Sequence, residues 1–202
     1  MSNKNIVYVH GKGGSAEEAE KYRVLFPSYY VYGIEYVKST PWEAGKEIRD
    51  SITSLSLLPD KLILIANSIG AFFSMHAGIE EYIKKAFFIS PIVDMKKLIL
   101  EMITLSRITD EELKRRKTVR TDSGEELSWD YYSFVTDHPV TWNVPTEVLY
   151  GSEDTLTKPE TIRSFCLEHS AALTVMEGGE HWFHTEEQMN FLYKWIKDGM
   201  VK

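Results

Sequence analysis

One serine of this sequence stands in a setting that suits a nucleophile. Ser68 follows the apolar run 62–65, has Ala66 and Gly70 two positions away on either side, and precedes a helical pattern. Small residues at those positions allow a sharp turn that lifts a serine hydroxyl above a sheet. The amino end of the following helix would favour negative charge there. An ordinary serine in a strand–helix turn is the alternative interpretation.

A serine nucleophile needs a base that takes its proton and a carboxylate that orients the base. In a strand–helix fold of this kind, the order along the chain is serine, acid, histidine. The apolar run 147–150 is followed by Glu153 and Asp154. We assign Asp154 as the acid, because Glu153 is longer by one methylene and lies earlier in the turn. The alternative is that Asp154 only shapes this loop.

Two histidines compete for the role of base after the last apolar run, 173–176. His181 lies in a glycine loop that can aim it across the edge of a sheet, whereas His184 lies just outside a helix whose predicted N-cap is Thr185. We therefore predict His181 as the base and give His184 a supporting hydrogen bond or a cap. A metal site at the two histidines is not expected, because no third ligand is suggested.

Two backbone N–H groups should receive the oxyanion of such a reaction. The residue after the nucleophile, Ile69, would supply one. Lys12, in the glycine-rich loop 10–15 after the first apolar run, would supply the other. We interpret His10 as a structural residue that ties this loop down. The proposed chemistry requires no cofactor and no metal.

Aromatic side chains suggest where an acyl group could bind. Trp129, Tyr132 and Trp142 belong to a segment between two predicted strands, and Trp182 lies beside the predicted base. They could line an apolar pocket, and packing against the edge of the sheet is the alternative. The predicted partner is a small-molecule acyl substrate. Ester, thioester, amide and acyl-transfer chemistry stay open, as does the oligomeric state.

Short apolar runs separated by helical patterns must position these residues. The runs are 6–9, 30–34, 62–65, 86–89, 147–150 and 173–176. Continuous apolar runs of this length are typical of strands buried on both faces. The alternation predicts an α/β fold with a mostly parallel sheet of about six strands and helices on both faces.

Five capping boxes mark predicted helix starts. In each, a serine or threonine precedes a glutamate or glutamine by three residues, so that each side chain can satisfy a backbone N–H of the other. The pairs are Ser15 and Glu18, Thr40 and Glu43, Thr109 and Glu112, Thr157 and Glu160, and Thr185 and Gln188.

The stretch at about 91–145 interrupts this rhythm. It contains predicted helices at 92–104 and 110–117, a turn at 122–124 and an aromatic segment at 129–134. An insertion of this size between two sheet strands indicates a lid or cap. We predict a single domain over residues 1–202 that carries this insertion.

Taken together, the motifs at 9–14, 67–70, 151–154 and 179–182 resemble the α/β-hydrolase superfamily, most closely its small bacterial members. The resemblance extends over about 6–197, apart from the insertion. It implies Ser68 as nucleophile, Asp154 as acid and His181 as base. We predict a carboxylesterase-like serine hydrolase that acts through an acyl-enzyme. The resemblance also implies that the run 6–9 matches the third strand of the family, so that two antiparallel strands of larger members are missing.

The glycine loop supports a second interpretation. Residues Gly11 to Ala16 also fit the pattern G-x-G-x-x-A, and Glu35 lies 35 − 11 = 24 residues after Gly11. A dinucleotide-binding oxidoreductase has such a loop and a distant acidic residue on the ribose. That interpretation does not explain the order of Ser68, Asp154 and His181.

Two further alternatives stay open. The same fold can serve as a non-catalytic binding protein, because fold does not fix function. Cys166 could act as a nucleophile, but it lies mid-helix, where a buried and inert thiol is usual.

Composition and charge argue against several other classes of protein. The chain has 202 residues, a net charge of −7 and one cysteine. Its most basic stretch, 114–117, is interpreted as a solvated helix face, so no nucleic-acid partner is expected. The start of the sequence does not resemble a signal peptide, and the longest apolar region, 62–79, has too many polar groups to span a bilayer. These features predict a cytoplasmic protein.

Overall fold

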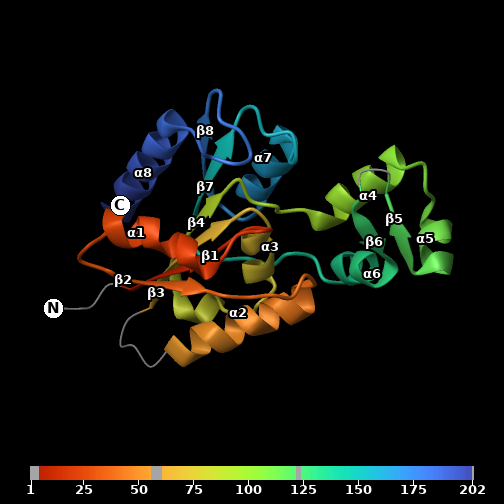
Figure 1. The fold of residues 1–202 in the computed structure, drawn as a ribbon, viewed down its shortest axis with the longest axis horizontal. Coiled ribbons are helices and arrows are strands. Elements are labelled where there is room, and N and C mark those ends of the chain that lie inside the picture. Colours follow the sequence, from red (N-terminus) through yellow and green to blue (C-terminus); the bar gives the residue numbers. More distant parts are fainter. Residues whose placement is uncertain (1–4, 56–60, 122–123, 202) are drawn as a thin grey trace. The chain divides into compact units, whose positions relative to one another are not determined.

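Six parallel strands form one sheet in the computed structural model, which describes residues 5–55, 61–121 and 124–201. The strands lie in the order β2-β1-β3-β4-β7-β8. Their bounds are β1 Asn5–Val9, β2 Tyr30–Ile34, β3 Leu62–Asn67, β4 Ile83–Ile89, β7 Thr146–Gly151 and β8 Ala172–Met176. Each predicted apolar run falls within one of these strands, so the prediction of a parallel α/β sheet is confirmed (Figure 1).

Helices cover both faces of this sheet. Their bounds are η1 Ala16–Ala19, α1 Glu20–Leu25, α2 Pro41–Leu55, α3 Ile69–Met75, η2 Glu80–Tyr82, α7 Pro159–Glu168 and α8 Glu186–Val201. Figure 1 shows α1 and α8 on one side and α2 on the other. On the first side Tyr8 packs on Tyr22 of α1, and Phe87 packs edge-on against Trp195 of α8. Burial of both strand faces explains the continuous apolar runs.

Most of the predicted N-cap residues lie directly before a helix. Thr40 accepts from the Glu43 N–H at 3.4 Å and donates to its carboxylate at 2.7 Å, before α2. Ser15, Thr109 and Thr185 likewise precede η1, α5 and α8. The box at Thr157 is wrong, because α7 begins at Pro159 after Lys158. The N–H of Thr157 donates instead to Asp154 Oδ1, and its carbonyl accepts from Tyr150.

The order of the strands reverses between β1 and β3. The chain goes from β1, the second strand of the sheet, to β2 at the adjacent edge and then returns past β1 to β3. In open α/β sheets, ligands bind outside the carboxyl ends of the strands at this point. The order also differs from the 3-2-1-4-5-6 order of dinucleotide-binding domains.

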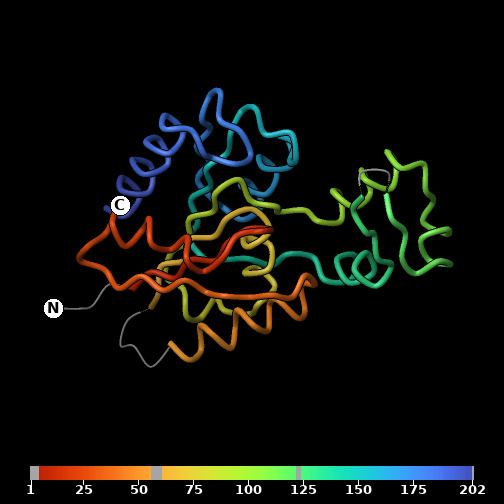
Figure 2. The backbone as a smooth tube through the Cα atoms, in the orientation of Figure 1, coloured from red at the N-terminus to blue at the C-terminus, as the bar shows by residue number. Residues whose placement is uncertain are grey.

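Residues 94–140 form a compact unit of their own, and residues 5–93 with 141–201 form the other, here called the body. The tube in Figure 2 can be followed from the body after β4 into this unit and back to β7. The unit has α4 Met95–Leu105, α5 Asp110–Arg116, the antiparallel pair β5 Thr118–Arg120 and β6 Glu126–Ser128, and α6 Trp129–Asp137. It falls inside the predicted insertion, and its role as a lid stays a prediction.

Three local predictions in this unit had different outcomes. The helix predicted from residue 92 begins at Met95, because Asp94 caps it by accepting from the Lys97 N–H at 2.9 Å. The aromatic segment after Ser128 is helical, and that serine caps it. The turn predicted at 122–124 lies outside the described residues except for Gly124. The sequence did not reveal the pair β5–β6, whose strands have three residues each.

Candidate active site

Ser68 occupies the sharp turn between β3 and α3. Its backbone has φ 51° and ψ −121°, a conformation that a serine adopts only under strain. The turn is close to the end of β1, since a Cβ on Gly70 would overlap the His10 carbonyl oxygen. Neither of these backbones can move aside easily. A glycine at position 70 is therefore needed to bring Ser68 against the loop after β1, as its spacing predicted.

Ser68, His181 and Asp154 form a chain of hydrogen bonds. Ser68 Oγ lies 2.9 Å from His181 Nε2, and His181 Nδ1 lies 2.7 Å from Asp154 Oδ2. An ionised carboxylate can only accept, so Nδ1 carries the ring proton and Nε2 accepts from the serine. The Asp154 side chain is 0% exposed and that of His181 is 23% exposed. The histidine can thus exchange a proton at the surface while its partner stays shielded from water.

Backbone contacts hold the acid. Asp154 Oδ1 accepts from the N–H groups of Leu156 at 2.8 Å and Thr157 at 3.1 Å. The carboxylate therefore has partners on both oxygens and a fixed orientation. Glu153, the rival acid, is exposed, and its N–H donates to the Gly179 carbonyl at 2.8 Å.

The loop that carries the acid is tied to the loop that carries His181. The Ser152 N–H donates to the Met176 carbonyl, and the Gly178 N–H donates to Ser152 Oγ, both at 2.9 Å. A Cβ on Gly151 would overlap the Gly179 carbonyl oxygen, so the two loops touch backbone to backbone. Their contact fixes the separation of the acid and the imidazole.

His184 makes its contacts with residues other than Ser68. Its Nδ1 lies 2.8 Å from the Trp182 carbonyl, and its ring stacks on that tryptophan at 4.8 Å. Its N–H donates to the Gln188 side chain, which places it at the start of α8. This is the supporting position that the sequence predicted for it.

The glycine loop after β1 passes directly beside the serine. A Cβ on Gly11 would stand 3.3 Å from Ser68 Cβ, and the Gly14 N–H closes a turn on the Gly11 carbonyl at 3.1 Å. Lys12 lies in this turn with an exposed side chain, and Ile69 is the first residue of α3. The two segments predicted to supply the oxyanion donors are therefore both next to Ser68.

His10 anchors this loop, as its sequence position suggested. The residue is 4% exposed, its ring stacks on Tyr36 with centroids 4.2 Å apart, and its Nδ1 lies 2.8 Å from the Gly11 carbonyl. Tyr36 in turn donates to the His10 carbonyl at 2.8 Å.

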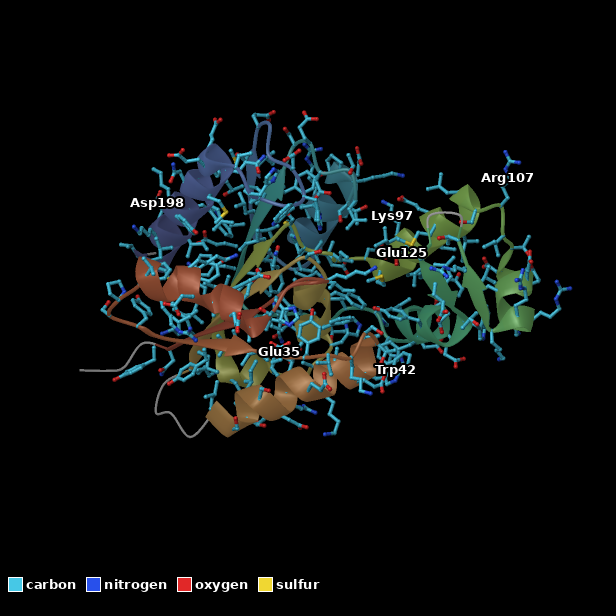
Figure 3. The ribbon with its side chains drawn as sticks, in the orientation of Figure 1. Glu35, Trp42, Lys97, Arg107, Glu125 and Asp198 are labelled. Carbon is cyan, nitrogen blue, oxygen red and sulfur yellow. The ribbon has the colours of Figure 1, made fainter. Side chains whose placement is uncertain are left out.

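The acidic residue of the dinucleotide interpretation has other partners. Glu35, labelled in Figure 3, accepts from the Ala16 N–H at 2.9 Å and lies 3.7 Å from His10 Nε2. It supports the same loop from the end of β2. This role and the strand order speak against a ribose site at Glu35.

Three residues near Ser68 were not assigned to the site from the sequence. Tyr8, Glu18 and Asn67 link the glycine loop to the nucleophile turn through hydrogen bonds. The sequence assigned Glu18 only to a capping box. No sequence signal pairs it with Tyr8, because this contact depends on how η1 folds back on β1.

The four predicted pocket residues lie in different surroundings. Trp182 is 70% exposed beside His181. Trp129 and Tyr132 pack on each other within the insertion, where Tyr132 donates to Asp110. Trp142 is 1% exposed, packs on Phe88 and donates to Thr146 Oγ1 at 2.8 Å. Trp142 is thus a core residue of the body, and we leave it out of the pocket that we propose.

Solved structures resemble this chain over nearly its whole length. Est1E from Butyrivibrio proteoclasticus matches with a TM-score of 0.76 and 14% identity, over 99% of this chain and 88% of that one. Alpha/beta hydrolase domain-containing protein 10 from mouse matches with a TM-score of 0.69 and 16% identity, over 98% and 89%. The chain has the α/β-hydrolase fold. The Paleococcus ferrophilus monoacylglycerol lipase also shares the α/β-hydrolase fold, with a TM-score of 0.68 and 17% identity, over 100% and 96%.

Comparison by sequence alone finds no such relatives. No protein-family model matches it, and no curated protein matches it. The α/β-hydrolase fold is therefore recognised through the three-dimensional arrangement and the short motifs, not through overall sequence similarity.

In the described part of the chain, no group of three or more His, Cys, Asp or Glu side chains could hold a metal ion. Every helix there is too short or too polar to span a membrane. Cys166 is buried in α7, and burial raises the pKa of its thiol to about 11. A thiol in that state is a poor nucleophile at neutral pH.

Proposed function

We propose that this protein is a serine hydrolase that cleaves small carboxylic esters through an acyl-enzyme. The observation that carries the proposal is the hydrogen-bonded chain from Ser68 through His181 to Asp154, built on a strained turn at Ser68. Strain at a non-glycine residue persists only where the surrounding structure maintains it, and such positions cluster at active sites. The esterases and the lipase among the structures of the same fold support this reaction class.

The acylation step follows from the proton positions. His181 Nε2 takes the proton of Ser68 as Oγ attacks the ester carbonyl carbon, and the carbonyl electrons move to oxygen. Asp154 stabilises the imidazolium that forms. The tetrahedral intermediate collapses, the bond to the alcohol oxygen breaks, and His181 gives its proton to the departing alcohol.

Deacylation repeats these steps with water. His181 removes a proton from a water molecule that attacks the acyl carbon, and the second intermediate releases the carboxylic acid. Ser68 recovers its proton from the imidazolium. In both steps the N–H groups of Lys12 and Ile69 would receive the oxyanion, and each such donor is worth about a hundredfold or more in rate.

For the substrate pocket we propose fewer residues than for the reaction. Trp182 is exposed beside His181 and would contact the substrate. We propose a small acyl substrate and a cytoplasmic protein, as the sequence predicted.

A fluorophosphonate probe tests this proposal. Treatment at about pH 8, followed by intact-mass spectrometry and peptide mapping, should give one adduct, on Ser68, because only an activated serine reacts with this phosphoryl centre. The Ser68→Ala variant should give none and should not hydrolyse p-nitrophenyl acetate. Absence of the adduct on folded wild-type protein, or retained hydrolysis by the variant, would contradict the proposal.

A further inference from the structure

Glu18 contacts both the end of the glycine loop, at Ser15, and strand β1, at Tyr8. Its Oε1 accepts from the Ser15 N–H at 3.3 Å, and its Oε2 accepts from the Tyr8 hydroxyl at 2.6 Å. Tyr8 is 0% exposed and belongs to β1. One carboxylate therefore joins the end of the loop to a rigid strand.

The path continues from the strand to the nucleophile. The Tyr8 hydroxyl also makes a hydrogen bond with the side chain of Asn67, the residue that precedes Ser68. The hydroxyl thus lies between Glu18 and Asn67. Through it, the loop after β1 and the turn after β3 share one set of partly buried contacts.

The fit of the loop over Glu18 is tight. A Cβ on Gly14 would overlap Glu18 Oε1 and would lie 3.1 Å from His10 Cβ. Glycine at position 14 therefore lets the loop rest directly on the carboxylate. Movement of Glu18 would remove the contacts that Gly14 and Ser15 make with this carboxylate.

Glu18 keeps its charge in this position. Burial raises the pKa of its carboxyl, but the hydrogen bond from Tyr8, the ammonium of Lys21 and the N–H of Ser15 together outweigh burial and hold the pKa below its usual value. The Lys21 nitrogen lies 3.5 Å from Oε2. An ionised carboxylate accepts at both oxygens, so it suits two donors that a glutamine of the same shape could not both satisfy.

We propose that Glu18 is a positioning residue that fixes the loop 11–15, and with it the Lys12 N–H, relative to Ser68. The inference rests on the proposed hydrolase function, in which this N–H receives the oxyanion. Oxyanion donors act mainly on the transition state, so their displacement lowers kcat more than it raises KM. A misplacement of about 1 Å can cost a hundredfold in rate.

The Glu18→Gln variant tests this role, with Glu17→Gln as the matched control on an exposed neighbour. We expect Glu18→Gln to lower kcat by about ten- to a hundredfold, with KM within about twofold of wild type. The rate is measured on p-nitrophenyl acetate and expressed per active site titrated with the fluorophosphonate, so that partial unfolding does not count as slow catalysis. Glu17→Gln should match wild type. Equal kcat values for the two variants would overturn the proposal.

A double-mutant cycle tests the path to β1. Tyr8→Phe removes only the hydroxyl and lies in the sheet interior. If Tyr8 and Glu18 act through one contact, the double variant Tyr8→Phe/Glu18→Gln should have nearly the same kcat as Glu18→Gln alone. Additive losses would show that the two residues act separately and would contradict the path.

Hydrogen exchange separates failure of this inference from failure of the proposed function. In the folded protein, Glu18→Gln should lose protection at the Ser15 amide, while amides of β3 keep theirs, and Glu17→Gln should change neither. This measurement does not require activity. If the wild-type protein hydrolysed no ester, the hydrolase proposal would fail, and unchanged protection at Ser15 would refute the positioning role independently.

Discussion

At the scale of single residues, the site depends on groups that are held before any substrate arrives. Asp154 has partners on both carboxylate oxygens, and one of them is His181. The imidazole is therefore fixed in the tautomer that accepts from Ser68. Preorganisation of this kind reduces the reorganisation that the reaction itself must drive.

Substitution of the two rival histidines distinguishes their roles. His181→Ala should lower kcat/KM by about ten-thousandfold, because no other group of the hydrogen-bonded chain can take the serine proton. His184→Ala should stay within about tenfold of wild type, since its side chain contacts Trp182 and Glu180. Hydrolysis of p-nitrophenyl acetate measures both. The opposite ranking of the two variants would assign the base to His184.

At the scale of elements, the residues of the proposed site all follow carboxyl ends of parallel strands. Ser68 follows β3, Asp154 follows β7 and His181 follows β8, while the glycine loop follows β1. Parallel strands place these ends at one edge of the sheet. Segments far apart in sequence therefore meet there, as the distance of 2.9 Å between Ser68 Oγ and His181 Nε2 shows.

Close approach of β1 and α3 sets the position of Ser68. Gly70→Ala should destabilise the fold by about 2 to 3 kcal/mol, because the new Cβ would overlap backbone atoms of His10 that cannot rotate away. It should also lower kcat, since the shift separates Ser68 from the glycine loop. Urea unfolding measures the first effect, with Ser54→Ala at an exposed position of α2 as the control, expected within about 0.5 kcal/mol. Unchanged stability of Gly70→Ala would show that the two elements can move apart freely.

At the scale of the whole molecule, the chain consists of a sheet body and an inserted unit with its own small core. Leu113, Val119 and Leu127 are buried in the insertion, and they come from α5, β5 and β6. The body keeps every residue of the proposed triad.

The single cysteine reports on the opening of the body. Because burial raises the pKa of Cys166 to about 11, only about one thiol in a thousand is ionised at pH 8, and as pH rises toward 11 that fraction grows. We expect almost no reaction of the native protein with Ellman's reagent at pH 8. In urea the reaction rate should rise in parallel with the unfolded population measured by circular dichroism. Rapid modification without urea would mean that α7 opens locally.

The sequence determined the features that depend on neighbours along the chain. Continuous apolar runs indicated the strands of the sheet, because burial of the inner strands on both faces leaves no room for polar alternation. The small residues around Ser68 indicated a sharp turn, and the caps at Thr40 and Thr185 marked helix starts. The order of serine, acid and histidine then named the three residues that the fold brings together.

Only the tertiary structure decided the features that depend on distant contacts. Thr157 failed as a cap because its backbone serves Asp154 and Tyr150, and Trp142 became a core residue because it packs on Phe88. The link from Glu18 to Tyr8 likewise exists only after η1 folds onto β1. A side chain's role depends on what surrounds it, and for these residues the surroundings come from other parts of the chain, beyond the reach of local spacing.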